Sequence, residues 1–358
     1  MANSVPQALQ GPFVWTGAEL QARTDWIEIL SQQELDEIHA AVTAVSDRGL
    51  DLYAVRKQDF PLDKLSFRLD RVVRELEDGR GLVVLRGLPA GQMTETQLRY
   101  AYWGIGVHMG IPVSQSGNGD LLGEVRNRGV LLGTPGARGY RGNHALPYHS
   151  DRCDYVGLLC LRNGKSGGWS RIASSAAVHN EMLKRRPDLV EALYQPFYMS
   201  WQGDEMPGWK PYYVAPVFGV REGKFSTHLA PSYIRAAQAN FAEVPRISEK
   251  QLEAIAYIQV IAAEIAFIEP FEIGDMQFLN NHVAFHGRTE FEDYEEEEKR
   301  RTLLRLWLSS RIGRALPEQS VTLWGSIDGG KTRGGVPAKD GGWRDVISRD
   351  RMTGANPP

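Results

Sequence analysis

The stretch LPYHSDRCDYVGLLCLRN (146–163) joins two patterns that set the fold and the chemistry of this chain. Its second half, YVGLLCLRN (155–163), is an apolar run with the length of one buried strand. Its first half carries His149 and Asp151 two residues apart. Alternate residues of an extended strand point to the same face, so we expect this imidazole and this carboxylate to lie side by side.

A second segment, NNHVAFHGRTEF (280–291), offers His282 and His286. Two neutral imidazoles and one carboxylate form the facial ligand set of non-haem Fe(II) oxygenases, which leaves three positions open for O₂ and a bidentate cosubstrate. A structural zinc site would be closed instead. Taken alone, an H-x-D triplet is equally typical of a hydrogen bond within a loop. We expect the remaining partnerless histidines to be structural, namely His39, His108, His179 and His228.

Apolar periodicity predicts helices separated by many short strands. The expected helices cover residues 31–45 (with Ser31 and Glu34 as a capping box), 62–79, 94–110, 174–193 with a break before Pro187, and 248–268. The expected strands cover residues 81–88, 155–163, 197–201, 212–220, 224–230, 271–273, 276–281 and 301–310. This order predicts an α+β protein with a β-sandwich or barrel and flanking helices.

Neither an internal repeat nor a low-complexity linker divides the chain, so we expect a single structural domain. Within it, residues 1–80 form a helical N-terminal extension packed on the core. Residues 81–316 form the main domain with helical insertions, and residues 317–358 form a C-terminal extension.

The composition narrows the function classes. The 358 residues are 42% hydrophobic and 24% charged, with a net charge of −3, so they lack the basic excess of a nucleic-acid binder. No apolar run is long enough to span a membrane, and the N-terminus does not have the pattern of a signal peptide. The two cysteines, Cys153 and Cys160, are too few for a disulfide framework. We therefore expect a cytoplasmic protein with a small-molecule partner and without nucleic-acid or membrane partners.

Four motifs occur in a family-like order: LPYHSDRCD, SGGWS (166–170), NNHVAFHGRTEF and RRTLLRLWL (300–308). Over residues 80–310 the chain resembles the taurine catabolism dioxygenase (TauD/TfdA-like) family, which belongs with the clavaminate-synthase-like oxygenases. The resemblance implies a double-stranded β-helix (jelly-roll, cupin-like) core that uses Fe(II), 2-oxoglutarate and O₂. It implies hydroxylation, desaturation or cyclisation of a small substrate, and homo-oligomers are common among similar proteins.

By this resemblance, His149 and Asp151 are the proximal iron ligands and His286 is the distal ligand. His282 falls at a variable position of the distal motif and ranks below His286. Because Asp151 keeps the carboxylate ligand that related halogenases lack, halogenation is not expected.

The resemblance also assigns the cosubstrate residues. Arg301 matches the arginine that binds the distal carboxylate of 2-oxoglutarate, and a guanidinium can hold a carboxylate by two parallel hydrogen bonds. Arg305, on the same side of the expected strand, would lie near the C1 carboxylate or a substrate anion. Ser170 stands where the family commonly has the threonine of Gly-Gly-Asp-Thr. Alternatively, both arginines pair with the acidic run 295–298, and Ser170 is a plain turn residue.

The segment RGYRGNHALPY (138–148) precedes the proximal ligands and should line the substrate cavity. Its candidates for polar substrate contacts are Arg138, Tyr140, Asn143 and His144, although each could simply order a loop. An arginine-bearing pocket suits a small carboxylate or an amino acid. Two other functions stay open: a non-catalytic metal or small-molecule binding protein, and a zinc hydrolase, which would have no use for Arg301.

Overall fold

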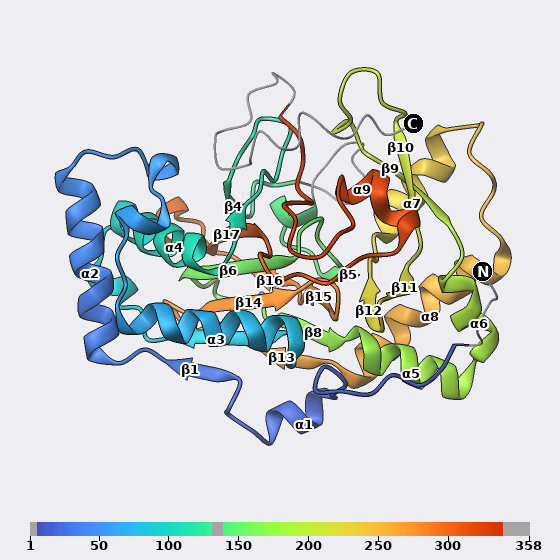
Figure 1. Ribbon diagram of the computed structural model, residues 1–358, viewed down its shortest axis with the longest axis horizontal. Coiled ribbons are helices and arrows are strands. Elements are labelled where there is room, and N and C mark those ends of the chain that lie inside the picture. Colours follow the sequence, from blue (N-terminus) through green and yellow to red (C-terminus); the bar gives the residue numbers. More distant parts are fainter. Residues whose placement is uncertain (1–5, 131–138, 339–358) are drawn as a thin grey trace.

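The computed structural model describes residues 6–130 and 139–338. Its larger sheet has seven strands in the order β1–β2–β14–β6–β17–β3, with β4 also paired to β17 (Figure 1). Their bounds are β1 (Ile27–Ile29), β2 (Leu82–Arg86), β3 (Ile111–Pro112), β4 (Leu122–Arg126), β6 (Tyr155–Arg162), β14 (Met276–Asn280) and β17 (Thr302–Ser309). All eight positions of β17 are buried, so this strand runs through the interior of the protein.

The smaller sheet has four strands in the order β13–β8–β15–β5, and it carries both histidine motifs. Its strands are β5 (Leu146–His149), β8 (Ser170–Ser174), β13 (Phe267–Glu269) and β15 (Ala284–Arg288). Three two-stranded pairs complete the β structure: β7 (Ser166–Gly167) with β16 (Phe291–Glu292), β9 (Phe197–Ser200) with β10 (Tyr212–Ala215), and β11 (Phe218–Arg221) with β12 (Lys224–Thr227). Two sheets with flanking helices confirm the expected α+β class.

The helices divide between the two sheets (Figure 1). Helices α3 and α4 contact the larger sheet, whereas α5 and α8 contact the smaller one. The bounds are α1 (Gly17–Gln21), α2 (Gln32–Asp47), α3 (Lys64–Asp78), α4 (Glu95–Met109), α5 (Ser175–Arg185), α6 (Pro187–Leu193), α7 (Pro231–Asn240), α8 (Glu249–Ile265) and α9 (Val321–Trp324). The expected capping box of Ser31 and Glu34 is confirmed at the start of α2. Within the described part of the chain, no helix has the length and apolarity needed to cross a bilayer.

The prediction of a strand at residues 271–273 is wrong. The actual strand, β13, lies earlier and ends before Pro270, which has no N–H group to donate to a neighbouring strand. The residues that follow form a turn in which the Glu272 N–H donates to Asp275 Oδ2 at 2.8 Å and Gly274 adopts φ +93°. Strand β15 was not among the expected strands, although all of its residues are buried.

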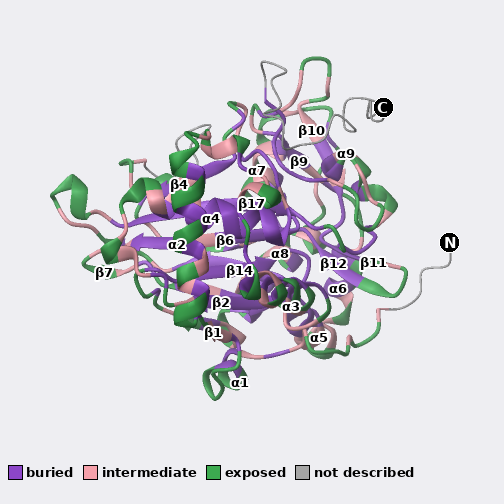
Figure 2. Cartoon of the chain, turned by 60° about the vertical axis from the view of Figure 1, so that its left-hand side comes forward, coloured by how far each residue is buried: buried purple, intermediate pink, exposed green. Residues whose placement is uncertain are grey.

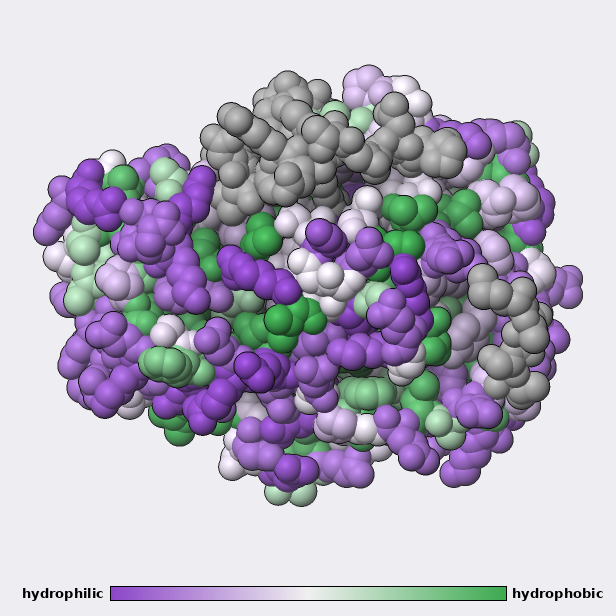
Figure 3. Space-filling model, in the orientation of Figure 1, coloured by the Kyte–Doolittle hydropathy of each residue, from purple (hydrophilic) through white to green (hydrophobic). Residues whose placement is uncertain are grey.

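Burial follows the sheets, as Figure 2 shows by the purple strands at the centre of the molecule. One apolar cluster packs the larger sheet against α2, α3 and α4, and a second packs the smaller sheet against α5, α6 and α8. On the face drawn in Figure 3, hydrophobic residues gather only in small separate groups among hydrophilic ones.

A buried ionic cluster ties the C-terminal segment to both histidine motifs. Asp154 Oδ1 lies 2.7 Å from His282 Nε2 and accepts from Arg333 Nε at 2.8 Å. All three residues are at most 1% exposed. Burial alone would raise the pKa of Asp154, but Arg333 and His282 lower it, so the carboxylate is ionised. Burial lowers the pKa of His282 to about 4, so this ring is neutral at pH 7.

Removing one partner from a buried ion pair leaves the other charge uncompensated, which typically costs 3–5 kcal/mol. We expect Arg333→Met to lower the free energy of unfolding by about 3–5 kcal/mol in denaturant titrations. The control is Lys331→Met, which removes an exposed cation two residues away and should change stability by less than about 0.5 kcal/mol. Equal effects of the two substitutions would contradict this account of the cluster.

Candidate metal centre

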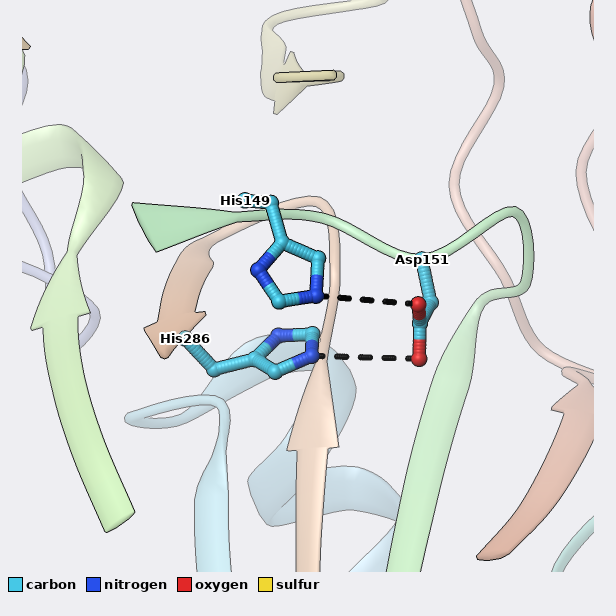
Figure 4. A group of neighbouring side chains, drawn as sticks. All are labelled: His149, Asp151 and His286. Carbon is cyan, nitrogen blue, oxygen red and sulfur yellow. Dashed lines mark ion pairs between the residues drawn. The ribbon is translucent and has the colours of Figure 1, made fainter. Parts of the chain in front are cut away.

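His149 and His286 face each other across the smaller sheet. They are paired residues of the antiparallel strands β5 and β15. Directly paired side chains stand on the same face of a sheet, and here the two ring centroids are 4.3 Å apart. Figure 4 shows both rings directed at Asp151. The two Nε2 atoms lie 4.0 Å and 3.8 Å from the nearer Asp151 oxygens, and the three ligand atoms lie within 4.8 Å of one another.

Asp151 reaches this site from a different position than expected. Strand β5 ends at His149, so Asp151 lies in the connection to β6 and not on the strand itself. Two long-range hydrogen bonds hold it there. The Asp151 N–H donates to Asn281 Oδ1 at 2.9 Å, and Trp307 Nε1 donates to Asp151 Oδ2 at 2.9 Å. The carboxylate is therefore oriented by β17 of the larger sheet, while the imidazoles come from the smaller sheet.

The protonation states suit a cation. His149 Nδ1 lies 2.9 Å from the carbonyl oxygen of Pro147, which can only accept, so Nδ1 donates. In the neutral ring this leaves the lone pair on Nε2, the nitrogen that faces Asp151. Burial, followed by the neighbouring His149, lowers the pKa of His286 to about 3 and keeps this ring neutral. Burial alone would raise the pKa of Asp151, but Arg305 and the two histidines outweigh it and lower this pKa. The site therefore combines a neutral His286, an ionised Asp151 and Nε2 of His149.

Arg305 lies beside the triad. Its Nη1 is 3.8 Å from Asp151 Oδ2, and its Nε donates to Gln115 Oε1 at 2.7 Å. The guanidinium carbon lies 4.6 Å from the ring centroid of Tyr140 and 4.8 Å from that of Trp307. These contacts fix a cation next to the candidate ligands, with 9% of the residue still exposed. The contributions of Gln115, Asn281 and Trp307 were not expected from the sequence.

Arg301 is almost completely buried beneath the Gly-Gly turn. Its Nη2 donates to the Gly168 carbonyl at 2.7 Å, whereas Nε and Nη1 are buried without a hydrogen-bond partner among the described residues. A Cβ on Gly168 would lie 2.5 Å from Arg301 Nε, so glycine is required for this approach. Burial lowers the pKa of Arg301 to about 10, which leaves it cationic at neutral pH.

The alternative of ion pairs with the acidic run finds no support in the described residues. The only ion pair of Arg305 there is the one with Asp151, and Arg301 has none. The 295–298 run pairs with other cations, as in the contacts of Glu296 with Lys299 and of Glu297 with Arg126.

Ser170 begins strand β8, directly after the turn. Its hydroxyl donates to Gln277 Oε1 at 2.8 Å, and the residue is buried. The side chain therefore faces the interior beside the larger sheet and is not part of an exposed turn.

The candidate substrate residues separate into different environments. Arg138 lies outside the described residues. Tyr140 packs on Arg305, whereas Asn143 Nδ2 donates to the Phe291 carbonyl at 3.3 Å. His144 is partly buried, and its carbonyl accepts from Arg288 at 2.7 Å. Of the three described candidates, only Tyr140 contacts a residue beside the triad.

The other histidines have partners elsewhere. His282 belongs to the buried cluster with Asp154, and His228 Nε2 lies 3.2 Å from the Tyr213 hydroxyl. His108 Nε2 lies 2.7 Å from the Phe60 carbonyl, and His179 Nε2 lies 3.1 Å from the Tyr194 hydroxyl. His39 is exposed.

Comparison with known proteins adds to this geometry. A family model described as taurine catabolism dioxygenase TauD, TfdA family matches residues 46–307. FR-33289 synthase of Streptomyces rubellomurinus is 30% identical over 331 residues, which cover 91% of this chain and 97% of that protein. Taurine hydroxylase-like protein SAT17 of Stachybotrys chartarum is 28% identical and covers 83% of this chain and 79% of its own length.

Two solved structures show the same fold. Asparagine oxygenase in complex with Fe(II), 2S,3S-3-hydroxyasparagine and succinate aligns with a TM-score of 0.63 at 18% identity, covering 87% of this chain and 99% of that chain. The non-haem iron oxygenase OrfP with Fe and alpha-ketoglutaric acid aligns with a TM-score of 0.59 at 16% identity, covering 86% of this chain and 99% of that chain. The expected jelly-roll core is confirmed by this likeness.

The bond from Trp307 to Asp151 can be tested by itself. Hydrogen bonds that orient a ligating side chain typically account for 10–100-fold in metal affinity. We expect Trp307→Phe to weaken Fe(II) binding about tenfold in an anaerobic titration. Trp103→Phe is the matched control, because it removes an indole N–H that donates to the distant Val55 carbonyl. Equal Fe(II) affinities of the two variants would argue against an orienting role.

Proposed function

Because the chain belongs to the taurine catabolism dioxygenase TauD/TfdA family of Fe(II)- and 2-oxoglutarate-dependent oxygenases, we propose that His149, Asp151 and His286 hold its iron and that it oxidises a small amino-acid-like or carboxylate substrate. The observation that carries the ligand assignment is the convergence of two imidazoles and one carboxylate from separate elements. These donor types suit Fe(II) and leave coordination sites open.

The residues present also fit 2-oxoglutarate. Arg301 has two buried donor nitrogens without a partner among the described residues, and a carboxylate would satisfy both. We assign the distal carboxylate of 2-oxoglutarate to Arg301. Ser170 follows Gly168, the residue that accepts from Arg301, by two positions, and we assign it a supporting hydroxyl contact.

The iron with 2-oxoglutarate and O₂ supplies the oxidising chemistry, in which one oxygen atom enters the substrate and the other enters succinate, released with CO₂. The chain's own residues supply position and charge. The Pro147 carbonyl fixes the tautomer of His149, and Trp307 fixes the carboxylate of Asp151. These contacts keep three donors directed at one point before any ligand arrives.

For the substrate, we propose an amino acid or another small carboxylate. Arg305, held between Tyr140 and Trp307 near Asp151, offers a partly exposed cation where a substrate carboxylate could bind. Relatives of the same fold were solved with hydroxyasparagine and with hydroxyarginine, and this supports an amino-acid-like molecule. A cytoplasmic location and the absence of nucleic-acid and membrane partners remain predictions from composition, and assembly into a homo-oligomer remains one from family resemblance.

The proposed function is tested by a screen of amino acids and small carboxylates in air with Fe(II) and 2-oxoglutarate. We expect one class to stimulate succinate release and to gain one oxygen atom by mass spectrometry. Loss of two hydrogens would indicate desaturation or cyclisation instead. His149→Ala and Asp151→Ala should abolish both iron binding and turnover. Full activity of either variant, or turnover with Zn(II) in place of Fe(II), contradicts the proposal.

The role of Arg301 has its own test. Charge-assisted hydrogen bonds are each worth about 1.5–3 kcal/mol, so Arg301→Met should raise the 2-oxoglutarate concentration needed for half-maximal activity by about 10–100-fold. Fe(II) affinity should stay within about twofold, because Arg301 is not among the triad. The control is Arg300→Met, since that guanidinium binds the carbonyls of Tyr294 and Glu295 instead. An unchanged 2-oxoglutarate requirement removes Arg301 from this role.

A further inference from the structure

A second arginine, Arg288, lies on the same strand as the candidate distal ligand. It is the last residue of β15, two positions after His286. The register with β5 shifts between these two residues, but the pairing of β15 with β8 is regular through both, so both side chains point to the same face. Its Cα partner on β8 is Ser170, the residue assigned to the distal end of the cosubstrate. Arg288 is 5% exposed. The register therefore places this guanidinium on the cosubstrate side of the sheet, farther along the strand than the metal ligands.

The described residues satisfy only part of the Arg288 guanidinium. Its Nη2 donates to the carbonyls of Gly142 and His144, at 2.9 Å and 2.7 Å. Its Nε and Nη1 are buried without a hydrogen-bond partner among the described residues. A buried donor without an acceptor costs about 1–3 kcal/mol, and more when it is charged. Two unsatisfied donors on one buried cation therefore point to an acceptor that the described residues do not supply.

The charge around this pair of arginines points to an anion. The guanidinium carbons of Arg288 and Arg301 lie 4.6 Å and 5.2 Å from the ring centroid of Phe291. Burial, followed by the charge of Arg301, lowers the pKa of Arg288 to about 9, and Asp293 opposes this shift. Among the carboxylates of the described residues, Asp293 alone raises the pKa of both arginines. Two cations against one carboxylate leave one positive charge, which a single carboxylate would neutralise.

We propose that Arg288 is a second binding arginine of the cosubstrate site and that, with Arg301, it holds the distal carboxylate of 2-oxoglutarate beside Phe291. This proposal rests on the proposed function. The hydrogen bonds from Arg288 Nη2 connect the segment 142–144 to the strand of His286. Arg288 therefore also joins the cosubstrate site to the segment before the proximal ligands.

The test compares two 2-oxo acids that share the chelating end. Anaerobic calorimetric titrations of the Fe(II)-loaded protein would use 2-oxoglutarate and 2-oxobutyrate, which lacks the distal carboxylate. We expect Arg288→Met to weaken binding of 2-oxoglutarate about tenfold or more and to leave binding of 2-oxobutyrate within about twofold, because only the former offers a distal anion. Arg288→Lys, which keeps the charge, should retain most of the preference for 2-oxoglutarate.

A matched variant distinguishes the loss of anion binding from the loss of hydrogen bonds to the segment 142–144. Asn143→Ala removes another hydrogen bond between the same segment and Phe291 without removing a cation. If Asn143→Ala lost the preference as Arg288→Met does, or if Arg288→Met kept it, the proposal would be overturned. Failure of the wild-type protein to bind 2-oxoglutarate at all would instead contradict the proposed function.

A structure of the wild-type protein with Fe(II) and 2-oxoglutarate, prepared without O₂, decides the matter even where a variant does not fold. Support requires the distal carboxylate within hydrogen-bond distance of Arg288 Nε or Nη1. A carboxylate bound by Arg301 alone overturns the proposal.

Discussion

The buried cluster of Asp154, His282 and Arg333 is the constraint on which the rest of the site depends. Asp154 follows Asp151 by three residues, and His282 precedes His286 by four. Their contact therefore fixes the two metal-binding segments relative to each other before any ligand is considered. The cluster has no access to water, so Arg333 must be present to neutralise the carboxylate. A segment distant in sequence thereby becomes necessary for the alignment of the triad.

This constraint explains why the three candidate ligands converge although they come from different elements. The pairing of β5 with β15 brings the two imidazoles together, but it does not place the carboxylate. Asp151 is placed by Asn281, in the turn before β15, and by Trp307 from the opposite sheet. Each bond spans more than a hundred residues, so the site is a product of tertiary packing. Its precision depends on the stability of the whole core.

The sequence predicted those features that depend on neighbouring residues. The capping box of Ser31 and the helix break before Pro187 follow from local rules and were confirmed. The strand at residues 271–273 was misplaced because a triplet with a charged residue between two apolar ones cannot be distinguished from a turn that buries one aromatic side chain. The roles of Trp307, Asn281 and Arg288 could not be predicted, since their partners are distant in sequence and only the fold brings them together.

The arrangement of charge gives the site a direction. One end offers two imidazoles and a carboxylate, a combination that favours a cation, while the other end offers buried donors of two arginines. A molecule with a chelating end and an anionic end can satisfy both only in one orientation. The metal and the cosubstrate would occupy these two ends. Selection among substrates would therefore depend on the other residues beside the triad. Among the described residues, these include Arg305, which is held between Tyr140 and Trp307. Residues that make relatives accept different substrates should therefore be sought first around this cation.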